Sequence, residues 1–382
     1  MLMFLVMNVT IASAQAPVPE ILADSAILVE ASTGRVIYEK NADVVRPPAS
    51  MTKMMTCILS IENLKKDTLV PISKEVTLID DTTFAWNLNE TIRADELTLG
   101  MMLVSDNAGA LALAEAISGD EKKFAEKMNE KAKEIGCTNT HFANPNGLPN
   151  DTHVSTARDM AKIAMYGMTI PEFRNIVSAH TASIHWTSPQ EKIVSALTTN
   201  NLIGVYNGIT GIKTGWTVAA GGCLAASAKR GDIELITIIM HSPDNHTRFD
   251  DASKLLDYGF GMVKLAKVLD KDEISRTSFV KDGKKATIKI KPLEDLTIAM
   301  LEGEDINKIK ITYDVPKIVE AGFTKGQILG NAQLEYDGKV LANVPLAAEE
   351  SVDKGFNIWS KLVAINIDFI SSLAQKYVMR NA

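Results

Sequence analysis

The chain has 382 residues, 46% of them hydrophobic, and a mean hydropathy near zero, which is typical of a globular protein with two or three domains. A net charge of −7 without a long basic run argues against nucleic acid as a partner. The three cysteines are widely spaced and the six histidines form no HExxH pattern, so we expect neither a disulfide framework nor a metal or other cofactor.

An apolar N-terminal stretch precedes the first charged residue, Glu20. Residues 1–7 are apolar or nearly so, and residues 12–14 have the small-x-small pattern of a signal-peptide cleavage site. No Lys or Arg precedes the apolar run. We therefore expect residues 1–14 to be a secretory signal truncated at its start, with a disordered apolar N-terminus as the alternative.

The next part of the chain predicts a hairpin followed by helices. Residues 25–40 alternate around the turn that contains Gly34, which indicates a β-hairpin. Apolar residues at spacings of three and four then predict a helix that begins near Ser50. A second helical zone covers residues 94–103, breaks at residues 105–107 and resumes immediately afterwards.

A helix and an antiparallel sheet follow. Residues 156–159 form a capping box at the start of a further helix. Two apolar runs, residues 223–227 and 233–239, flank a turn at Gly231 and predict an antiparallel pair, and residues 247–257 predict a helix that returns to it. Helices before and after an antiparallel sheet indicate an α+β or sandwiched α/β domain, which we expect over residues 20–262.

The C-terminal part has a different sequence pattern. Short strands separated by polar turns predict a small β-sandwich over residues 263–350, with strands near residues 278–280, 286–290, 309–313 and 331–336. Residues 355–382 carry apolar residues at helical spacing, interrupted by charges. We expect an amphipathic helix that binds a membrane surface without spanning it, and packing on its own domain is the alternative.

Ser50-Met51-Thr52-Lys53 matches the pattern S-x-x-K. At i and i+3 on a helix both side chains lie on one face. A lysine among methionines is partly desolvated, which lowers its pKa and makes it a base for the serine hydroxyl. The alternative is a surface lysine beside an N-cap serine. Two further copies of the pattern, at residues 278–281 and 351–354, lie in strand and linker contexts and are discarded.

Two more short motifs complete a set. Ser105-Asp106-Asn107 is the only S-x-N, at the break between two helical zones, although such a sequence alone is more often a helix N-cap. Lys213-Thr214-Gly215 is the only K-T-G, on a predicted strand where the glycine permits close backbone approach and the lysine favours an anionic ligand. S-x-x-K, S-x-N and K-T-G in this order are a known set of β-lactamases and penicillin-binding proteins.

The sequence resembles the D-alanyl-D-alanine carboxypeptidases, which are the low-molecular-mass penicillin-binding proteins. The resemblance spans nearly the whole chain and includes "RPPASMTKMMT", "LVSDNAGALALAE", "ANPNGLP", "HVSTARDMAKIA", "GITGIKTGWT" and "TRFDDASKLLDYGF". It implies a penicillin-binding/β-lactamase-like α/β (α+β) domain with an antiparallel sheet flanked by helices, then a β-sandwich and an amphipathic helix. It also implies removal of the terminal D-Ala from peptidoglycan stem pentapeptides at the outer face of the bacterial cytoplasmic membrane, with β-lactams as covalent inhibitors.

The resemblance implies a role for each motif residue. Ser50 is the acylated nucleophile and Lys53 its base, while Ser105 and Asn107 complete the proton network and hold the peptide. The substrate carboxylate is bound by the strand that carries Lys213, Thr214, Gly215 and Trp216. The backbone N–H groups of Ser50 and Trp216 form the oxyanion hole. Arg248 is a further candidate for the carboxylate, with a surface ion pair as the alternative. For His153, a capping role at the helix that follows is favoured, and a position at the border of the cleft is the alternative.

Two departures from the family pattern concern the rim of the site. Trp216 stands where many members have His or Tyr, and residues 80–92 lack the expected Gly/Ser-rich segment. A class A β-lactamase is disfavoured because it needs a glutamate near the cleft, and none lies between Glu134 and Glu172. A non-catalytic peptidoglycan-binding protein is disfavoured because every motif is intact, and an endopeptidase using the same residues stays an alternative.

Overall fold

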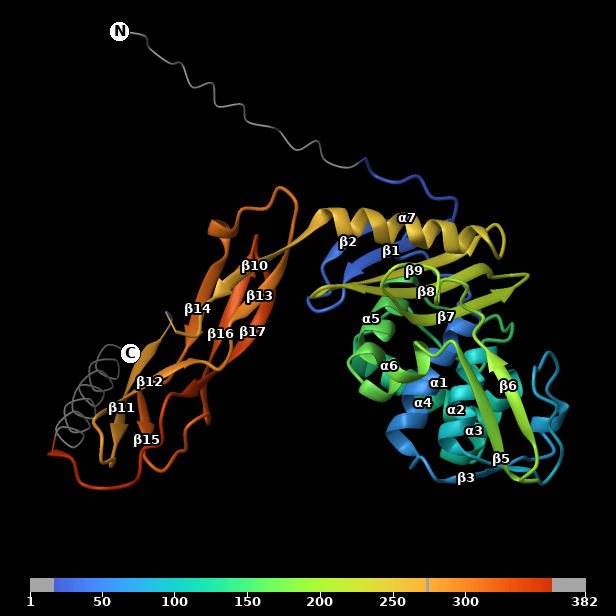
Figure 1. Ribbon diagram of the computed structural model, residues 1–382, viewed down its shortest axis with the longest axis horizontal. Helices are drawn as coiled ribbons and strands as arrows, with labels where there is room; N and C mark the ends of the chain where they lie inside the picture. The colour runs from blue at the N-terminus through green and yellow to red at the C-terminus, as the bar shows by residue number, and fades with distance from the viewer. Residues whose placement is uncertain (1–16, 273–274, 359–382) are drawn as a thin grey trace, which may run out of the picture. The chain divides into compact units, whose positions relative to one another are not determined.

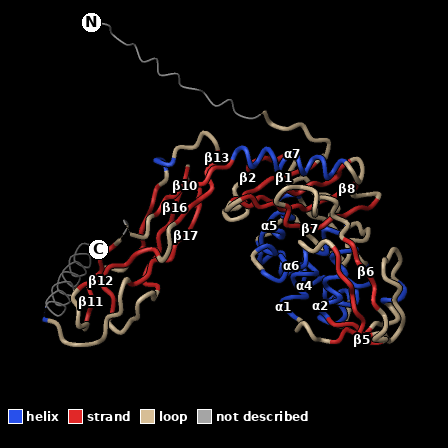
Figure 2. Tube along the Cα trace, in the orientation of Figure 1, coloured by secondary structure: helices blue, strands red, loops and turns tan. Residues whose placement is uncertain are grey.

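The computed structural model describes residues 17–272 and 275–358 (Figures 1 and 2), and the chain divides into two compact units between Val263 and Lys264. The expected signal peptide, residues 1–14, and the expected tail helix from residue 359 onward lie outside the described residues. Within the described ranges, no helix combines the length and the apolar character needed to cross a bilayer.

A five-stranded antiparallel sheet organises the first unit, in the order β2-β1-β9-β8-β7. Its strands are β1 (Ser25–Glu30), β2 (Val36–Lys40), β7 (Ile209–Thr217), β8 (Gly221–Arg230) and β9 (Ile233–Ser242). The β1–β2 hairpin and the β8–β9 pair are both as predicted. Gly34 has φ +68° in the hairpin turn, which explains why glycine stands there.

Helices cover both faces of this sheet, and Figure 1 shows α7 on one face and the other helices on the opposite face. The helices are α1 (Lys53–Asn63), α2 (Ala94–Val104), α3 (Asn107–Ser118), α4 (Glu121–Ile135), α5 (Ala157–Met168), α6 (Pro171–Val177) and α7 (Thr247–Met262). Because both faces are covered, β8 is an almost continuously buried run rather than an alternating strand. The α2–α3 break and the α5 capping box, with Thr156 Oγ1 accepting from Asp159 N at 3.1 Å, confirm two predictions.

The predicted helix does begin near Ser50, but its first turn is a 3-10 helix rather than an α-helix. Ser50 lies in a short 3-10 helix, η1 (Ala49–Thr52), and α1 begins at Lys53. Pro47 and Pro48 immediately precede η1, and a proline lacks the N–H and restricts the residue before it, so the chain enters the helix through a tighter turn.

A second, smaller sheet in the first unit has no counterpart in the sequence analysis. Its order is β3-β4-β5-β6, with β3 (Leu69–Pro71), β4 (Thr91–Arg93), β5 (Thr181–Ser188) and β6 (Ile193–Leu197). A 3-10 turn, η2 (Val76–Leu78), lies between β3 and β4. The first two strands have three residues each, which is too short to show an alternating pattern.

The second unit is made of strands, as expected. Six of them form one sheet in the order β14-β16-β17-β12-β11-β15, and β10 pairs with β13. Their bounds are β10 (Val263–Leu269), β11 (Arg276–Lys281), β12 (Thr287–Pro292), β13 (Leu296–Leu301), β14 (Lys310–Asp314), β15 (Ile318–Glu320), β16 (Ile328–Tyr336) and β17 (Lys339–Ala348), with a 3-10 turn η3 (Ile306–Lys308). Two apolar clusters, centred on Ile290 and Leu334, form its core.

Candidate active site

Lys53 is the centre of the site. Its side chain is fully buried, and Nζ donates to Ser50 Oγ at 3.0 Å, to Asn107 Oδ1 at 2.7 Å and to the main-chain oxygen of Asn146 at 2.8 Å. An ammonium group has three hydrogens, so these three acceptors complete its donor capacity. The structure thus brings together the predicted Ser50, Lys53 and Asn107.

Burial sets the charge of this lysine. Removal from water lowers the pKa of Lys53 from 10.5 to about 7, although the negative charges of Asp106 and Asp81 act in the opposite direction. A lysine with this pKa is deprotonated in a large fraction of molecules at neutral pH. A neutral amine 3.0 Å from the Ser50 hydroxyl has the position and the basicity to accept its proton.

The S-x-N turn is held in place by its middle residue. Asp106 is fully buried and caps α3 by accepting from Gly109 N at 2.7 Å. Its carboxylate also accepts from one side chain and two backbone groups of residues 82–84, and from Trp86 Nε1 at 2.9 Å. The segment without the expected Gly/Ser-rich stretch is therefore attached to this carboxylate, and it closes one side of the site.

The outer residues of the S-x-N turn, Ser105 and Asn107, flank the anchored Asp106. Ser105 has φ +62°, a left-handed conformation that is uncommon outside glycine, and its side chain is partly exposed rather than bonded to Lys53. Asn107 is almost fully buried, and its Nδ2 donates to the main-chain oxygen of Asp81 at 2.7 Å. The amide is thus fixed so that its oxygen faces Lys53.

The K-T-G strand lies directly against η1. A Cβ atom built on Gly215 would lie 2.9 Å from Ser50 N and 3.1 Å from Met51 N, so only glycine permits this approach. Lys213 is 1% exposed, and its Nζ donates to the main-chain oxygen of Thr214 at 3.0 Å. Burial, with the positive charges of Lys53 and Arg248, lowers the pKa of Lys213 well below its usual range.

Trp216, near the end of this strand, and Arg248, beside it, occupy different environments. The Trp216 side chain is half exposed, while Arg248 on α7 is 7% exposed. Nη1 of Arg248 donates to the main-chain oxygens of Gly215 at 2.6 Å and Cys223 at 3.2 Å. The alternative of a surface ion pair for Arg248 is excluded by this burial, and its charge lies next to the K-T-G strand.

The sequence analysis did not assign the loop that contains Asn146 and Gly147 to the site. The Asn146 carbonyl is one of the three acceptors of Lys53. Gly147 has φ +87°, and a Cβ atom there would lie 2.0 Å from the oxygen of Ala49 and 3.0 Å from Ser50 N. The string "ANPNGLP" contains both residues, but a backbone carbonyl and a close approach have no side-chain signature.

From the sequence, we expect β-lactams to acylate Ser50. On that expectation, Gly147→Ala reduces acylation by benzylpenicillin severely, because the added methyl group would displace the backbone of Ala49 and Ser50. Gly136→Ala is the matched control, since Gly136 has φ +88° but no atom lies within 4 Å of the place that a Cβ would occupy. Both variants carry the same backbone strain. Equal rates of acylation in the two variants, measured by mass spectrometry, would show that the contact with η1 is unimportant.

His153 connects the same loop to η1, and the expectation that it caps a helix is wrong because Thr156 caps α5. Its Nδ1 accepts from Ala143 N at 3.0 Å, so the ring proton is on Nε2, which lies 2.7 Å from Thr52 Oγ1 and donates to it. Burial is the main cause that lowers the pKa of His153 to about 4, so the ring is neutral at pH 7.

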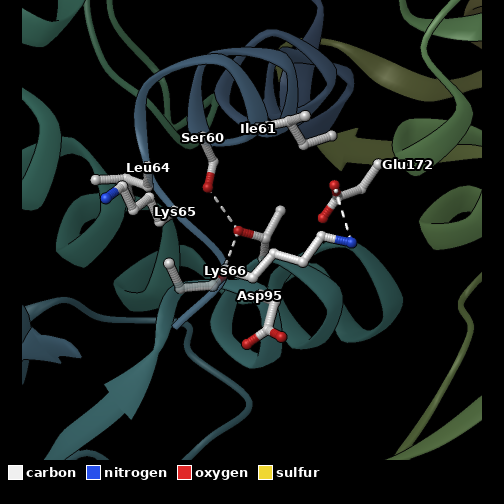
Figure 3. Close-up of a pocket in the computed structure, with 9 residues that line it drawn as sticks. Ser60, Ile61, Leu64, Lys65, Lys66, Asp95 and Glu172 are labelled. Atoms are coloured by element: carbon white, nitrogen blue, oxygen red, sulfur yellow. Dashed lines mark hydrogen bonds and ion pairs between the residues drawn. The ribbon is translucent and has the colours of Figure 1, made fainter. Parts of the chain in front are cut away.

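Two cavities near α1 differ in size and place. A cavity of about 10 Å³ lies at the C-terminal end of the helix. Around it, Lys66 forms an ion pair with Glu172 at 3.2 Å, and Ser60 forms a hydrogen bond with Thr98 (Figure 3). That volume holds at most one water molecule. A larger cavity of about 240 Å³ is lined by ten residues that include Pro47, Gly147 and Thr217.

Comparison with known proteins agrees with this geometry. The family model described as D-alanyl-D-alanine carboxypeptidase matches residues 10–244, and the C-terminal domain of penicillin-binding protein 5 matches residues 264–354. D-alanyl-D-alanine carboxypeptidase DacF of Bacillus subtilis is 34% identical over 337 residues, 87% of this chain and 86% of its own, and DacC of Escherichia coli is 28% identical over 352 residues, 88% and 86%.

The solved structure of penicillin-binding protein 5 from Haemophilus influenzae superposes with a TM-score of 0.70 at 28% identity, covering 89% of this chain and 100% of that one. Both the catalytic unit and the β domain are thus shared with these proteins. This chain belongs to the D-alanyl-D-alanine carboxypeptidase family of serine peptidases.

Proposed function

We propose that Ser50 is the nucleophile that removes the terminal D-Ala from a peptide ending in D-Ala-D-Ala. The observation that carries the proposal is the bond from the buried Lys53 amine to Ser50 Oγ. Ser50 Oγ attacks the carbonyl carbon of the penultimate D-Ala as neutral Lys53 accepts the hydroxyl proton. The tetrahedral intermediate then collapses, the C–N bond breaks and the leaving amine receives that proton. Water hydrolyses the resulting ester.

The oxyanion formed in the first step needs hydrogen-bond donors. We assign the backbone N–H groups of Ser50 and Trp216, because Gly215 holds β7 against η1 within van der Waals distance. Donors of this kind, fixed before the reaction, stabilise the charge that develops on the carbonyl oxygen. We also assign Asn107 and Ser105 to the space next to Ser50. Asn107 is held there by its hydrogen bond from Lys53, and Ser105 lies at the end of α2, two residues before Asn107.

The carboxylate of the departing D-Ala is assigned to the K-T-G strand. Burial lowers the pKa of Lys213, and so does the positive charge of Arg248 and of protonated Lys53 close to it. An anion bound beside them relieves this mutual repulsion, which favours a substrate that ends in a free carboxylate. Thr214 presents its hydroxyl at the same place, and Trp216 is exposed where the substrate would approach.

The cellular substrate in this proposal is the stem peptide of peptidoglycan, and β-lactams are covalent inhibitors that acylate Ser50. The support is the family membership and the similarity to penicillin-binding protein 5. Such a substrate lies outside the cytoplasm, in agreement with the signal-like sequence of residues 1–14. We also propose that residues 355–382 bind a membrane surface; equal flotation of the full chain and a chain ending at residue 354 on lipid vesicles would refute this.

The experiment that tests the catalytic proposal has two readouts. Intact mass spectrometry after incubation with benzylpenicillin is expected to show one adduct, and a pentapeptide ending in D-Ala-D-Ala is expected to release one D-Ala. Ser50→Ala is expected to lose both signals. An adduct on the Ser50→Ala protein, or a wild-type protein that releases no D-Ala, would contradict the assignment.

A further inference from the structure

Thr199 lies between two of the motifs, although the sequence analysis gave it no role. It follows β6, and its backbone N–H donates to the main-chain oxygen of Leu103 at 3.1 Å, two residues before Ser105. Its Oγ1 lies 2.5 Å from Oγ1 of Thr214. Thr199 therefore connects the end of α2, which leads into the S-x-N turn, to the K-T-G strand.

The two hydroxyl groups form a pair with a defined donor capacity. Each hydroxyl has one hydrogen, and one of the two hydrogens is used within the pair. Whichever group donates, one hydroxyl hydrogen stays available for a ligand. When a carboxylate binds, both groups are able to turn toward it, because a carboxylate accepts several hydrogen bonds and donates none.

Accessibility distinguishes the members of this pair. Thr214 is 4% exposed, whereas the Thr199 side chain is exposed at the surface. The basic side chains of this region are also buried: Lys213 is 1% exposed and Arg248 is 7% exposed, and both donate to main-chain oxygens. Arg248 thus supplies a positive field, and the hydroxyl groups supply the direct contacts.

We propose that Thr199 is a specificity-determining residue: with Thr214 it forms a paired hydroxyl donor that selects substrates with a free C-terminal carboxylate. The inference rests on the proposed function, because it concerns the carboxylate of the same substrate. The exposed Thr199 hydroxyl binds one carboxylate oxygen and Thr214 binds the other. A substrate that ends in an amide offers a single acceptor oxygen and an NH₂ group, so it gains less from the pair.

The test compares two peptides that differ only at the C-terminus, one ending in D-Ala-D-Ala with a free carboxylate and one ending in D-Ala-D-alaninamide. Thr199→Val keeps the side-chain shape but removes the hydroxyl. It is expected to lower the ratio of kcat/KM for the acid to kcat/KM for the amide by about tenfold, the size of one hydrogen bond to a charged group. Thr199→Ser keeps the hydroxyl and is expected to restore the ratio to within about threefold of wild type.

The matched control is Thr198→Val in the same loop. Its hydroxyl accepts from Asn200 N at 3.2 Å and has a local role, so the ratio is expected to stay at the wild-type value. A Thr199→Val protein that loses both activities in equal proportion would overturn the inference, since that result indicates a structural role. If Thr199→Val does not fold, Thr199→Ala gives the same comparison. Failure of the wild type to release D-Ala would refute the proposed function instead.

Discussion

Replacing Lys53 with arginine is expected to lower kcat/KM for D-Ala release by about 1,000-fold, within the range for loss of a general base. Arginine keeps the positive charge, but its pKa stays far above neutral, so it cannot accept the Ser50 proton at neutral pH. The expected loss therefore separates a base from a fixed cation. Steady-state kinetics with a D-Ala-D-Ala peptide measures it, and thermal unfolding confirms that the variant is folded.

Lys123→Arg is the control for this substitution. Lys123 lies on the surface of α4 in an ion pair with Asp120 at 2.8 Å, so arginine is expected to replace it without loss of activity. Lys53→Arg activity within tenfold of wild type would show that Lys53 acts through its charge. The base would then have to be another group.

The pH profile of the wild type tests the same role without a substitution. The pKa of Lys53 is about 7, so its amine is neutral above this pH and protonated below it. We expect kcat/KM to rise with pH through about 7 and to level off above it, since this parameter reports the pKa of the free enzyme. A profile that is flat between about pH 5 and 9 would contradict the assignment.

The lowered pKa of Lys53 also makes the stability of the fold depend on pH. In the unfolded chain Lys53 returns to its ordinary pKa of 10.5, so between pH 7 and 10.5 the unfolded state binds more protons than the folded state. The burial of this amine therefore destabilises the fold most below pH 7, and this cost decreases as the pH rises toward 10.5. The same environment that makes Lys53 a base thus lowers stability at acidic pH.

Local sequence predicted part of this site well. Ser50 and Lys53 are one turn apart, and Asn107 stands at a helix start, so a short motif contains their geometry. The motif did not show that the first turn is a 3-10 helix, which follows from the two prolines before it. Even so, three residues separate the two side chains in either helix type, and their hydrogen bond forms as expected.

The rest of the site depends on contacts between distant parts of the chain. Asn146 contributes a main-chain carbonyl, which any residue possesses, so its side chain gave no signal. Thr199 is 15 residues from Thr214, and its loop follows β6 of the β3-β4-β5-β6 sheet. These strands were missed because their stability comes from pairing and burial rather than from their own residue pattern.

Asp106→Ala is expected to lower the free energy of unfolding by about 3 to 5 kcal/mol, because it leaves several buried donors without an acceptor. Five donors surround the carboxylate at 2.6 to 2.9 Å, including the Trp86 indole and the backbone N–H of Gly109. Asp120→Ala is the matched control: Asp120 caps the next helix through Lys123 N but is exposed, and its loss is expected to cost about 1 kcal/mol. Urea denaturation measures both values.

Asp106→Asn tests whether an uncharged amide of the same shape stabilises the fold as well as the carboxylate does. Oδ2 accepts from three donors of residues 82–84, and Oδ1 accepts from Trp86 Nε1 and Gly109 N. An amide has one oxygen, so its NH₂ group must face donors in either orientation. We therefore expect a loss of stability close to that of Asp106→Ala, and a loss below about 1 kcal/mol would contradict this interpretation.

The same substitutions are expected to slow acylation while the protein is still folded. Residues 82–86 are held to the carboxylate, and the adjacent Asp81 supplies the carbonyl that fixes the Asn107 amide. Release of this segment frees the amide to rotate, so Lys53 loses a fixed acceptor. Acylation by benzylpenicillin, measured well below the unfolding temperature, is expected to slow by about tenfold or more, the value of one lost hydrogen bond to a charged group. An unchanged rate in a destabilised variant would show that Asp106 stabilises the fold without positioning the site.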